Sequence, residues 1–323
     1  MRSTSSEPIA RRHDAASLAL TALATALAGC SFANAPAAPR PPLSAAELGV
    51  RIDVVPEPQL QTLVQRSPGR FQGILTCEGE EVAFEWRTAP EDPGRPVVLL
   101  VPILAGGDDL MDQVANRVQA HGFDVAFCAR AGGALRQGQR GQDLDNLFRR
   151  TVLHQRLVLR WLRERHAAPS AQFVLGISLG GMVTTVLAAE EPGLAGIAIC
   201  LSGGDIKNLI ATSSEGRVQR WREWRRREDG IGDDELRSEL EQCLTHEPLR
   251  YAPAVPTERV LLVEATLDTV VPERHQDLLW EALGRPARYS LPLGHYTAAL
   301  AIDSIVEQVA HHFSTRCDIA LGK

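Results

Sequence analysis

Gly176-Ile177-Ser178-Leu179-Gly180 is the stretch of sequence that decides the fold. The apolar run 172–177 leads into it, and a run of small and apolar residues, 180–190, follows it. In this strand–turn–helix context the serine of a G-x-S-x-G pentapeptide is exposed as a nucleophile at the end of a sheet. The alternative is a Gly-rich turn of a dinucleotide-binding domain, but the G-x-G-x-x-G spacing is missing and the position is late in the chain. The pentapeptide therefore predicts a nucleophilic Ser178, which needs a base, an acid and oxyanion donors.

Outward from the pentapeptide, short apolar runs alternate with helical segments. The predicted strands are 71–76, 82–88, 97–101, 124–129, 172–177, 196–201, 259–265 and 287–291. The predicted helices are 109–121, 144–166, 180–190, 273–283 and 297–313. Continuous apolar strands separated by helices indicate a parallel sheet covered on both faces, and a turn at 78–80 makes the first two strands a hairpin. The predicted fold class is α/β, a mostly parallel, doubly wound sheet with an antiparallel N-terminal hairpin and a helical cap insert.

The acid is predicted just past the end of a later strand. Asp268 follows the apolar strand 259–265, at the sheet edge where ligands bind in open α/β sheets. Asp268 could instead form an Asx-turn or cap the next helix. Asp205, just past the preceding strand, is the second candidate, and Glu264, inside the strand, is a weaker one.

The base is predicted after the last strand. His295 stands in Pro-Leu-Gly-His-Tyr, directly after strand 287–291 and before the last helix, and the chain order Ser, Asp, His suits a triad. Four other histidines are predicted to be solvated or to cap helices: His154, His275, His311 and His312.

With these residues the chain resembles an α/β-hydrolase over about 70–315. The resemblance implies that Ser178 is the nucleophile, Asp268 the acid and His295 the base. It further implies chemistry without a metal or cofactor, in which Ser178 attacks an ester and an acyl-enzyme forms. Thioesters, amides and lactones suit the same triad, so a thioesterase, a lactone or dienelactone hydrolase and a peptidase stay open. A catalytically silent binding protein with this fold is the alternative from another class.

The resemblance also implies two oxyanion donors. One is the backbone N–H of Leu179, and the other comes from the loop 101–107, where Ile103 or Leu104 could donate but Pro102 cannot. This loop lacks the His-Gly pair that is common in lipases and esterases. The departure matters, because losing one oxyanion donor costs about 3–4 kcal/mol of transition-state stabilisation.

The insert at about 205–256 resembles the cap of this family. Six arginines surround Trp221 and Trp224, namely Arg217, Arg220, Arg222, Arg225, Arg226 and Arg227. One interpretation is a lid that contacts an anionic substrate or lipid headgroups. The other is an amphipathic helix with Val218, Trp221 and Trp224 on its inner face and the arginines in water.

The N-terminal region is typical of a bacterial lipoprotein signal. Arg11-Arg12-His13 precede an apolar run, 15–28, and Leu27-Ala28-Gly29-Cys30 resembles a lipobox, in which Cys30 is lipidated. Ser31 then indicates the outer membrane, facing the periplasm of the cell envelope. A soluble Ala-rich helix and a plain cleaved signal are the alternatives.

The predicted division of the chain follows from this signal. Residues 1–29 form a signal peptide, 30–69 a lipidated tether and lead-in, 70–315 the hydrolase domain, and 316–323 a tail. The predicted partners are a small-molecule or lipid ester and, through the anchor, a membrane.

Composition limits other functions. The net charge of −6 over 323 residues gives no reason to expect nucleic acid as a partner. The six cysteines show no metal-binding spacing, so no metal site is predicted. Cys128 and Cys200 lie in apolar runs and are predicted core residues, although export would permit a disulfide among Cys77, Cys128, Cys200, Cys243 and Cys317.

Overall fold

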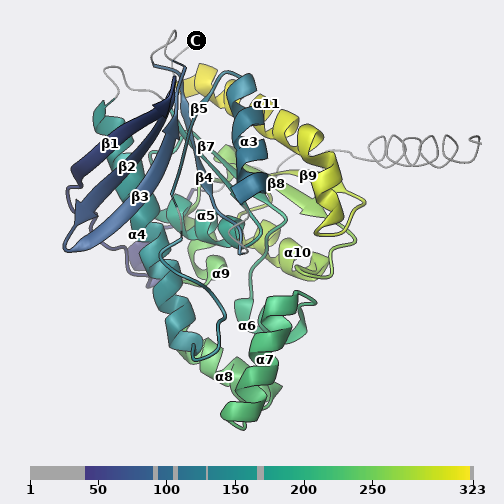
Figure 1. Cartoon of the computed structure of the whole chain (residues 1–323). Coiled ribbons are helices and arrows are strands. Elements are labelled where there is room, and N and C mark those ends of the chain that lie inside the picture. The colour runs from purple at the N-terminus through teal and green to yellow at the C-terminus, as the bar shows by residue number, and fades with distance from the viewer. Residues whose placement is uncertain (1–40, 90–93, 105–107, 129, 166–170, 321–323) are drawn as a thin grey trace, which may run out of the picture.

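A computed structural model describes residues 41–89, 94–104, 108–128, 130–165 and 171–320 (Figure 1). The predicted signal peptide and Cys30 lie outside these residues. The strands are β1 Gln59–Ser67, β2 Arg70–Cys77, β3 Glu80–Arg87, β4 Val97–Val101, β5 Asp124–Cys128, β6 Gln172–Ile177, β7 Gly196–Cys200, β8 Val260–Ala265 and β9 Ala287–Leu291. They form a 9-stranded sheet in the order β1-β2-β3-β5-β4-β6-β7-β8-β9.

The antiparallel part of the sheet is larger than predicted. The expected hairpin is β2 and β3, but β1 pairs antiparallel with β2, and β3 pairs antiparallel with β5. Strand β1 falls in the predicted lead-in because its sequence, Gln-Leu-Gln-Thr-Leu-Val-Gln-Arg-Ser, is mostly polar and its side chains are mostly exposed. Leu60 and Leu63 are half-buried against the core, but a register shift between them interrupts the apolar alternation that would reveal the strand.

The remaining strands are parallel, which confirms the predicted fold class. Strands β4 and β6, at the centre, are buried along their whole length, as expected of strands covered on both faces. The helices that cover the sheet are α3 Asp108–Ala120, α4 Gly141–Arg165, α5 Leu179–Glu190, α10 Glu273–Ala282 and α11 Ile302–Ala320. A 3-10 turn at Thr297–Ala301 precedes α11, so the final helix begins later than predicted and extends past the boundary expected at 315.

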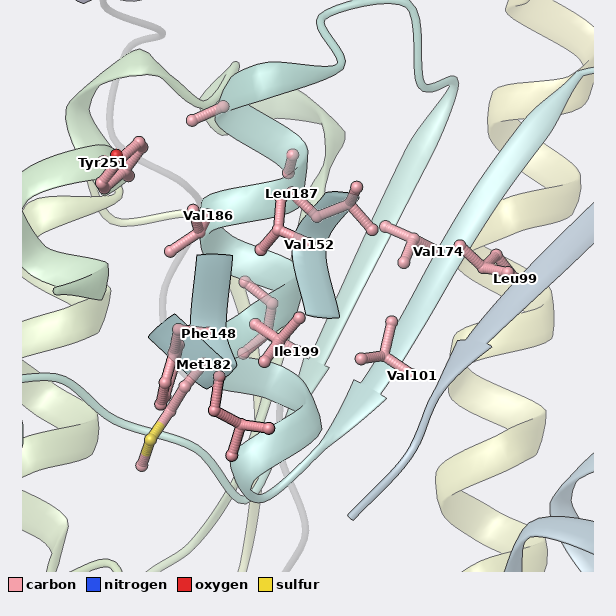
Figure 2. Close-up of a cluster of buried hydrophobic side chains, with 14 of the residues drawn as sticks. Leu99, Val101, Phe148, Val152, Val174, Met182, Val186, Leu187, Ile199 and Tyr251 are labelled. Carbon is pink, nitrogen blue, oxygen red and sulfur yellow. The ribbon is translucent and has the colours of Figure 1, made fainter. Parts of the chain in front are cut away.

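Two apolar clusters lie on opposite faces of the sheet. Helices α4 and α5 cover one face and α3 and α11 cover the other (Figure 1). Successive residues of β4 belong to different clusters, since Leu99 packs with the first and Leu100 with the second. Figure 2 shows the first cluster, in which side chains of α4 and α5 lie together with residues of β4, β6 and β7.

The insert forms a helical cap at the end of the sheet that carries Ser178. Its helices are α6 Ile206–Thr212, α7 Gly216–Glu228, α8 Asp233–Cys243 and α9 Pro248–Tyr251. On α7, Val218 and Trp221 are buried and Trp224 is half-buried, as the amphipathic interpretation predicts.

Arg225 corrects that interpretation, because it does not lie in water. Its side chain is 3% exposed and forms ion pairs with Asp229 and Glu239, each at 2.5 Å. The guanidinium also lies over the ring of Trp221. The arginine therefore links α7 to α8 inside the cap.

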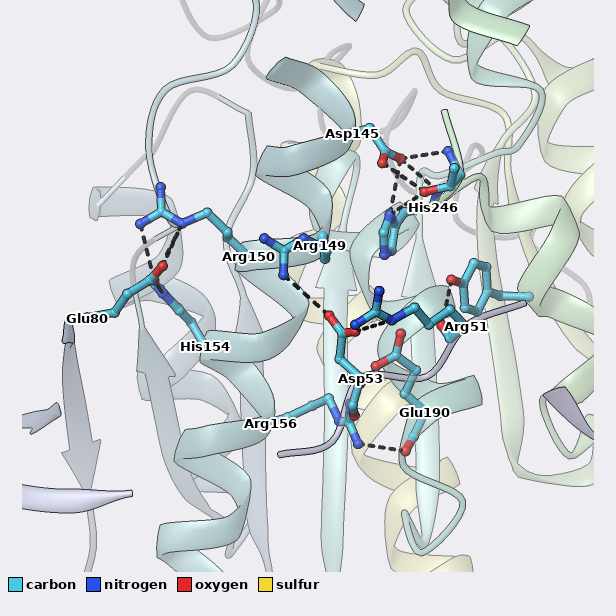
Figure 3. Close-up of polar contacts among 12 residues, drawn as sticks. Arg51, Asp53, Glu80, Asp145, Arg149, Arg150, His154, Arg156, Glu190 and His246 are labelled. Atoms are coloured by element: carbon cyan, nitrogen blue, oxygen red, sulfur yellow. Dashed lines mark hydrogen bonds and ion pairs between the residues drawn. The ribbon is translucent and has the colours of Figure 1, made fainter. Parts of the chain in front are cut away.

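Polar contacts tie the helices together on the α4 side of the sheet (Figure 3). Arg156 of α4 donates to Glu190 at 2.6 Å and to Glu191 at 2.8 Å, at the end of α5. At the start of α4, Asp145 accepts hydrogen bonds from the backbone N–H groups of Thr245 and His246, at 2.7 and 2.8 Å. These bonds hold the residues just before α9 against the start of α4.

Three histidines that were predicted to be solvated or capping are buried or half-buried. His154 is buried and bonds Glu80 at 2.7 Å. His275 is buried and donates to the carbonyl of Gly204 at 2.9 Å, while His312 donates to the carbonyl of Arg259 at 3.0 Å. Burial lowers the pKa of His312 to about 4, so this side chain is a neutral packing residue at ordinary pH. Only His311 of this group is exposed as predicted.

The five described cysteines are free thiols, so the disulfide that export would permit does not occur among them. Cys128 and Cys200 are buried, as predicted. Among the described residues, no helix has the length and apolar character to cross a bilayer. Nor do His, Cys, Asp and Glu side chains gather into a metal-binding group in that part of the chain.

Candidate active site

Ser178 lies on a strained turn between β6 and α5. Its φ of 56° and ψ of −123° are unusual for a residue with a side chain, a conformation that costs of order 1–3 kcal/mol. The backbone N–H of Ser178 donates to the carbonyl of Cys200 at 2.8 Å, which holds the turn to the end of β7.

The two glycines of the pentapeptide are required by close packing. A Cβ on Gly176 would lie 2.2 Å from Thr184 Oγ1, and one on Gly180 would lie 2.3 Å from the carbonyl oxygen of Val101. Helix α5 therefore starts directly against the end of β4, and Ser178 comes next to the loop that follows that strand.

The structure brings Ser178, His295 and Asp268 together. His295 Nε2 lies 3.0 Å from Ser178 Oγ, and His295 Nδ1 lies 2.6 Å from Asp268 Oδ2. Asp268 follows β8 and His295 follows β9, so both reach the serine from the carboxyl ends of parallel strands. The side chain of Asp268 is fully buried and that of His295 is 11% exposed, which keeps bulk water away from the bond between them.

Asp268 makes the contacts expected of both of the roles that the sequence left open. Its Oδ1 accepts from the backbone N–H groups of Val270 and Val271, each at 2.8 Å, in the manner of an Asx-turn. Its Oδ2 remains for the imidazole of His295. The turn therefore orients the carboxylate toward the histidine.

The other candidate acids have different partners. Asp205 Oδ2 accepts from Asn208 at 2.8 Å, and its backbone N–H donates to Glu247. Glu264 forms an ion pair with Arg288 and a hydrogen bond with Ser290. Neither carboxylate bonds His295 in the described part of the chain, so Asp268 is the acid that the geometry favours.

The residues expected to donate to an oxyanion line one cavity with the serine. Ile103, Leu104 and Leu179 share it with Ser178 and His295. Residues 105–107 of the same loop lie outside the described residues. Arg130, after β5, donates to the carbonyl oxygens of Ile103 and Leu104 and so holds this loop, a role that sequence reasoning missed.

The cavity beside Ser178 is apolar and measures about 210 Å³. Helices α4, α5, α6 and α7 and the loop at 134–135 supply its aliphatic and aromatic wall. This wall includes Leu104, Leu135, Leu144, Phe148, Met182, Ile206, Leu209, Ile210 and Val218. Among the described residues, polar side chains enter the lining at only a few positions, Ser178, Ser213, Glu215, His295 and Tyr296. The cavity therefore suits an uncharged, apolar group attached to a reacting carbonyl.

Glu215 and Tyr296 bring polar groups to the cavity. Glu215 caps α7 by accepting from the backbone N–H of Val218 at 2.8 Å. Burial, together with the negative charge of Glu215, raises the pKa of Tyr296. The hydroxyl of Tyr296 is therefore a neutral group at ordinary pH, and the carboxylate disfavours an anionic substrate group in its neighbourhood.

Comparison with protein-family models gives no match, and neither does comparison with curated proteins. The solved structures with similar folds include a cold-adapted esterase from an Arctic intertidal metagenomic library, at 14% identity and TM-score 0.52 over 79% of this chain and 99% of that one. They also include acetyl xylan esterase 1 from a Thermoanaerobacterium species, at 17% identity and TM-score 0.58 over 81% and 91% of the two chains. A third is a putative dienelactone hydrolase from Klebsiella pneumoniae, at 15% identity and TM-score 0.52 over 79% and 99%. At these identities the likeness concerns the fold.

Proposed function

We propose that this chain, which has the α/β-hydrolase fold, is a serine hydrolase that cleaves carboxylic esters. The observation that carries the proposal is the unbroken contact from Ser178 Oγ to His295 at 3.0 Å and from His295 to Asp268 at 2.6 Å. The esterase names of the structural neighbours support the same reaction class.

The acylation half of the reaction begins at Ser178. His295 Nε2 takes the proton of Ser178 Oγ as the oxygen attacks the ester carbonyl, and a tetrahedral oxyanion forms. The Nε2 proton then passes to the leaving alcohol oxygen as the ester C–O bond breaks. An acyl group on Ser178 and a free alcohol result.

Deacylation repeats these steps with water. His295 takes a proton from a water molecule, and the hydroxide attacks the acyl carbonyl. The proton on Nε2 returns to Ser178 Oγ as that bond breaks, which releases the carboxylic acid. Asp268 keeps the Nδ1 proton in place and stabilises the imidazolium that forms in each half.

The apolar cavity supports esters with an uncharged hydrocarbon acyl group. Burying each methylene contributes about 0.8 kcal/mol, so such a wall favours aliphatic chains over short or charged ones. Because one of the structural neighbours is a putative dienelactone hydrolase, cyclic esters are a second candidate class of substrate. Thioesterase, peptidase and silent binding functions have no such observation in their favour and serve as outcomes of the test below.

Labelling with a fluorophosphonate probe tests the proposal. Wild-type protein is expected to react, and Ser178→Ala is expected to lose both labelling and ester hydrolysis. A panel of esters, thioesters, lactones and peptides on both proteins assigns the class. A wild type that neither labels nor hydrolyses short activated esters would leave a binding protein as the correct interpretation.

The place of this enzyme in the cell is a separate proposal, namely a lipid-anchored protein of the outer membrane that faces the periplasm. It rests on the lipobox-like Leu27-Ala28-Gly29-Cys30. Several acyl chains at Cys30 would hold the protein at a membrane, where ester lipids are also found. Cys30→Ala is expected to move the protein to the soluble fraction, and an unchanged distribution rejects lipidation.

A further inference from the structure

Two arginines hold the loop between β4 and α3 by its carbonyl groups. Arg130 Nη1 donates to the carbonyl oxygens of both Ile103 and Leu104, the second at 2.6 Å. Arg217 Nη1, from the cap helix α7, donates to the same Leu104 oxygen at 3.3 Å. The loop at the serine is therefore bonded both to the connection after β5 and to the cap.

The bond to Ile103 decides where the next N–H points. The peptide bonds of the described residues are trans, and in a trans peptide the carbonyl of one residue and the N–H of the next point in opposite directions. Since the Ile103 carbonyl faces Arg130, the Leu104 N–H faces away from Arg130. Leu104 is among the residues that line the cavity containing Ser178, whereas Arg130 and Arg217 are not among them, so the direction away from the guanidinium is the direction of the cavity.

The preceding peptide unit is turned differently. The Pro102 carbonyl oxygen would lie 3.0 Å from a Cβ on Gly180, so it faces the start of α5. The Ile103 N–H belongs to this unit and therefore points away from the serine turn. Of the two residues that the sequence left open, Leu104 is the one with a suitably directed donor.

We propose that Arg130 is a positioning residue: it fixes the direction of the Leu104 N–H, which acts as the second oxyanion donor beside the N–H of Leu179. Arg217 bonds the same loop and so couples the direction of this N–H to the position of the cap. The inference rests on the proposed esterase function. Neither guanidinium has an ion-pair partner among the described residues, and their hydrogen bonds go to backbone oxygens. No carboxylate among the described residues therefore neutralises the two guanidinium charges. They polarise the peptide groups whose carbonyls they bond and so make the N–H groups of those peptides stronger donors.

Arg130→Met tests the positioning role. Without the clamp, the Leu104 N–H loses its fixed direction, and kcat is expected to fall by about 10²-fold, as for the loss of one oxyanion donor, with KM nearly unchanged. Arg130→Lys keeps the charge but presents one compact ammonium group in place of the planar fork, so kcat should recover only in part. Arg217→Met should lower kcat by a smaller factor, because Arg130 still holds the loop.

A transition-state analogue separates positioning from general damage. A trifluoromethyl ketone forms a tetrahedral oxyanion on Ser178, and its affinity is expected to fall across the variants by the same factor as kcat/KM. Fluorophosphonate titration gives the fraction of protein molecules with a competent active site. Because kcat is then calculated per competent site, misfolded protein does not lower it. Arg136→Met is the matched control, since Arg136 belongs to the same connection after β5 but donates to neither carbonyl.

Each outcome decides the question. Loss of kcat and of analogue affinity together in Arg130→Met, with Arg136→Met like the wild type, supports the inference. An unchanged kcat, or equal effects in the two variants, overturns it while the esterase activity stands. A wild type without esterase activity instead removes the proposed function. If Arg130→Met does not fold, the same comparison on Arg130→Lys decides.

Discussion

At the scale of single residues, the groups of the proposed triad depend on neighbours that permit only one backbone arrangement. Ser178 has a positive φ, and the glycines on either side leave no room for a side chain. The strain is tolerated because packing around the turn determines its conformation. This local constraint gives the first prediction.

Gly180→Ala should destabilise the protein and remove its activity. The new Cβ would meet the Val101 carbonyl, a backbone atom at 2.3 Å that cannot easily move aside. We expect the free energy of unfolding in urea to fall by about 1–3 kcal/mol. Gly193→Ala is the control, because a Cβ there has nothing within 4 Å, and its unfolding free energy should stay within about 0.5 kcal/mol of the wild type. Equal effects in the two variants contradict this account.

Asp268→Asn should reduce kcat about 10⁴-fold with little change in KM. The amide can still occupy the turn with Val270 and Val271, but it no longer supplies a charge to the imidazolium. Steady-state kinetics on an activated ester measure the effect. Asp205→Asn tests the alternative acid in the same assay and should leave kcat close to that of the wild type.

The three residues of the proposed triad could be located from sequence because each follows an apolar strand in a required chain order. Ser178 has a pentapeptide signature, and Asp268 and His295 follow β8 and β9. Arg130 could not be found in this way. It acts through backbone carbonyls, which leave no residue type to recognise.

At the scale of elements, ion pairs hold helices to each other where apolar packing ends. Arg156 of α4 bonds Glu190 at the end of α5 (Figure 3), and it also bonds the next residue, Glu191. Burial raises the pKa of Glu190 to about 7 in spite of this arginine. The helix junction should therefore depend on pH near neutrality.

Glu190→Gln is the test of that dependence. The folded pKa of about 7 stands above the ordinary value of 4.5, so the folded state binds an extra proton between them. The stability linked to this proton is complete below about pH 4.5 and is lost as the pH rises through 7. In urea unfolding, the free energy of unfolding of the wild type should fall by on the order of 2 kcal/mol between pH 5 and pH 8. The variant should not show this fall. Glu164→Gln, at an exposed position, should keep the decline.

Element prediction succeeded where burial gives a strand or helix its own pattern. Strands β4, β6 and β9 have the bounds that their apolar runs predict. Strand β1 was missed because it is mostly polar and a register shift separates its two core-facing leucines, Leu60 and Leu63. Arg225 and His154 were misplaced, because a buried charged or polar side chain is indistinguishable in sequence from a solvated one when its partners, Glu239 and Glu80, come from distant segments.

At the scale of the whole molecule, the cavity brings together segments far apart in the chain. Its wall comes from α4, α5, the cap and the last 3-10 turn, so no single stretch of sequence predicts the cavity. The size and polarity of the cavity therefore could not be predicted, although its position at the serine could.

The activity should depend on the length of the acyl chain. With p-nitrophenyl esters, kcat/KM is expected to rise about fourfold for each added methylene until the cavity is full, since burying one contributes about 0.8 kcal/mol. Leu209→Trp, on α6, should shift the optimum to shorter chains, because the indole fills part of the cavity. Leu278→Trp, at an exposed position on α10, should leave the profile unchanged. A profile that is flat with chain length contradicts the assignment of the cavity to the acyl group.

The buried free thiols make the protein a reporter of its own unfolding. Cys200 is the last residue of β7, and its carbonyl accepts the hydrogen bond from the Ser178 N–H. Cys128 is the last residue of β5, just before Arg130 in the chain. Burial raises the pKa of both thiols, that of Cys128 to about 12, so neither reacts while the sheet is closed. The rate at which a thiol reagent modifies them would measure how often the strand ends that carry the active site open to solvent.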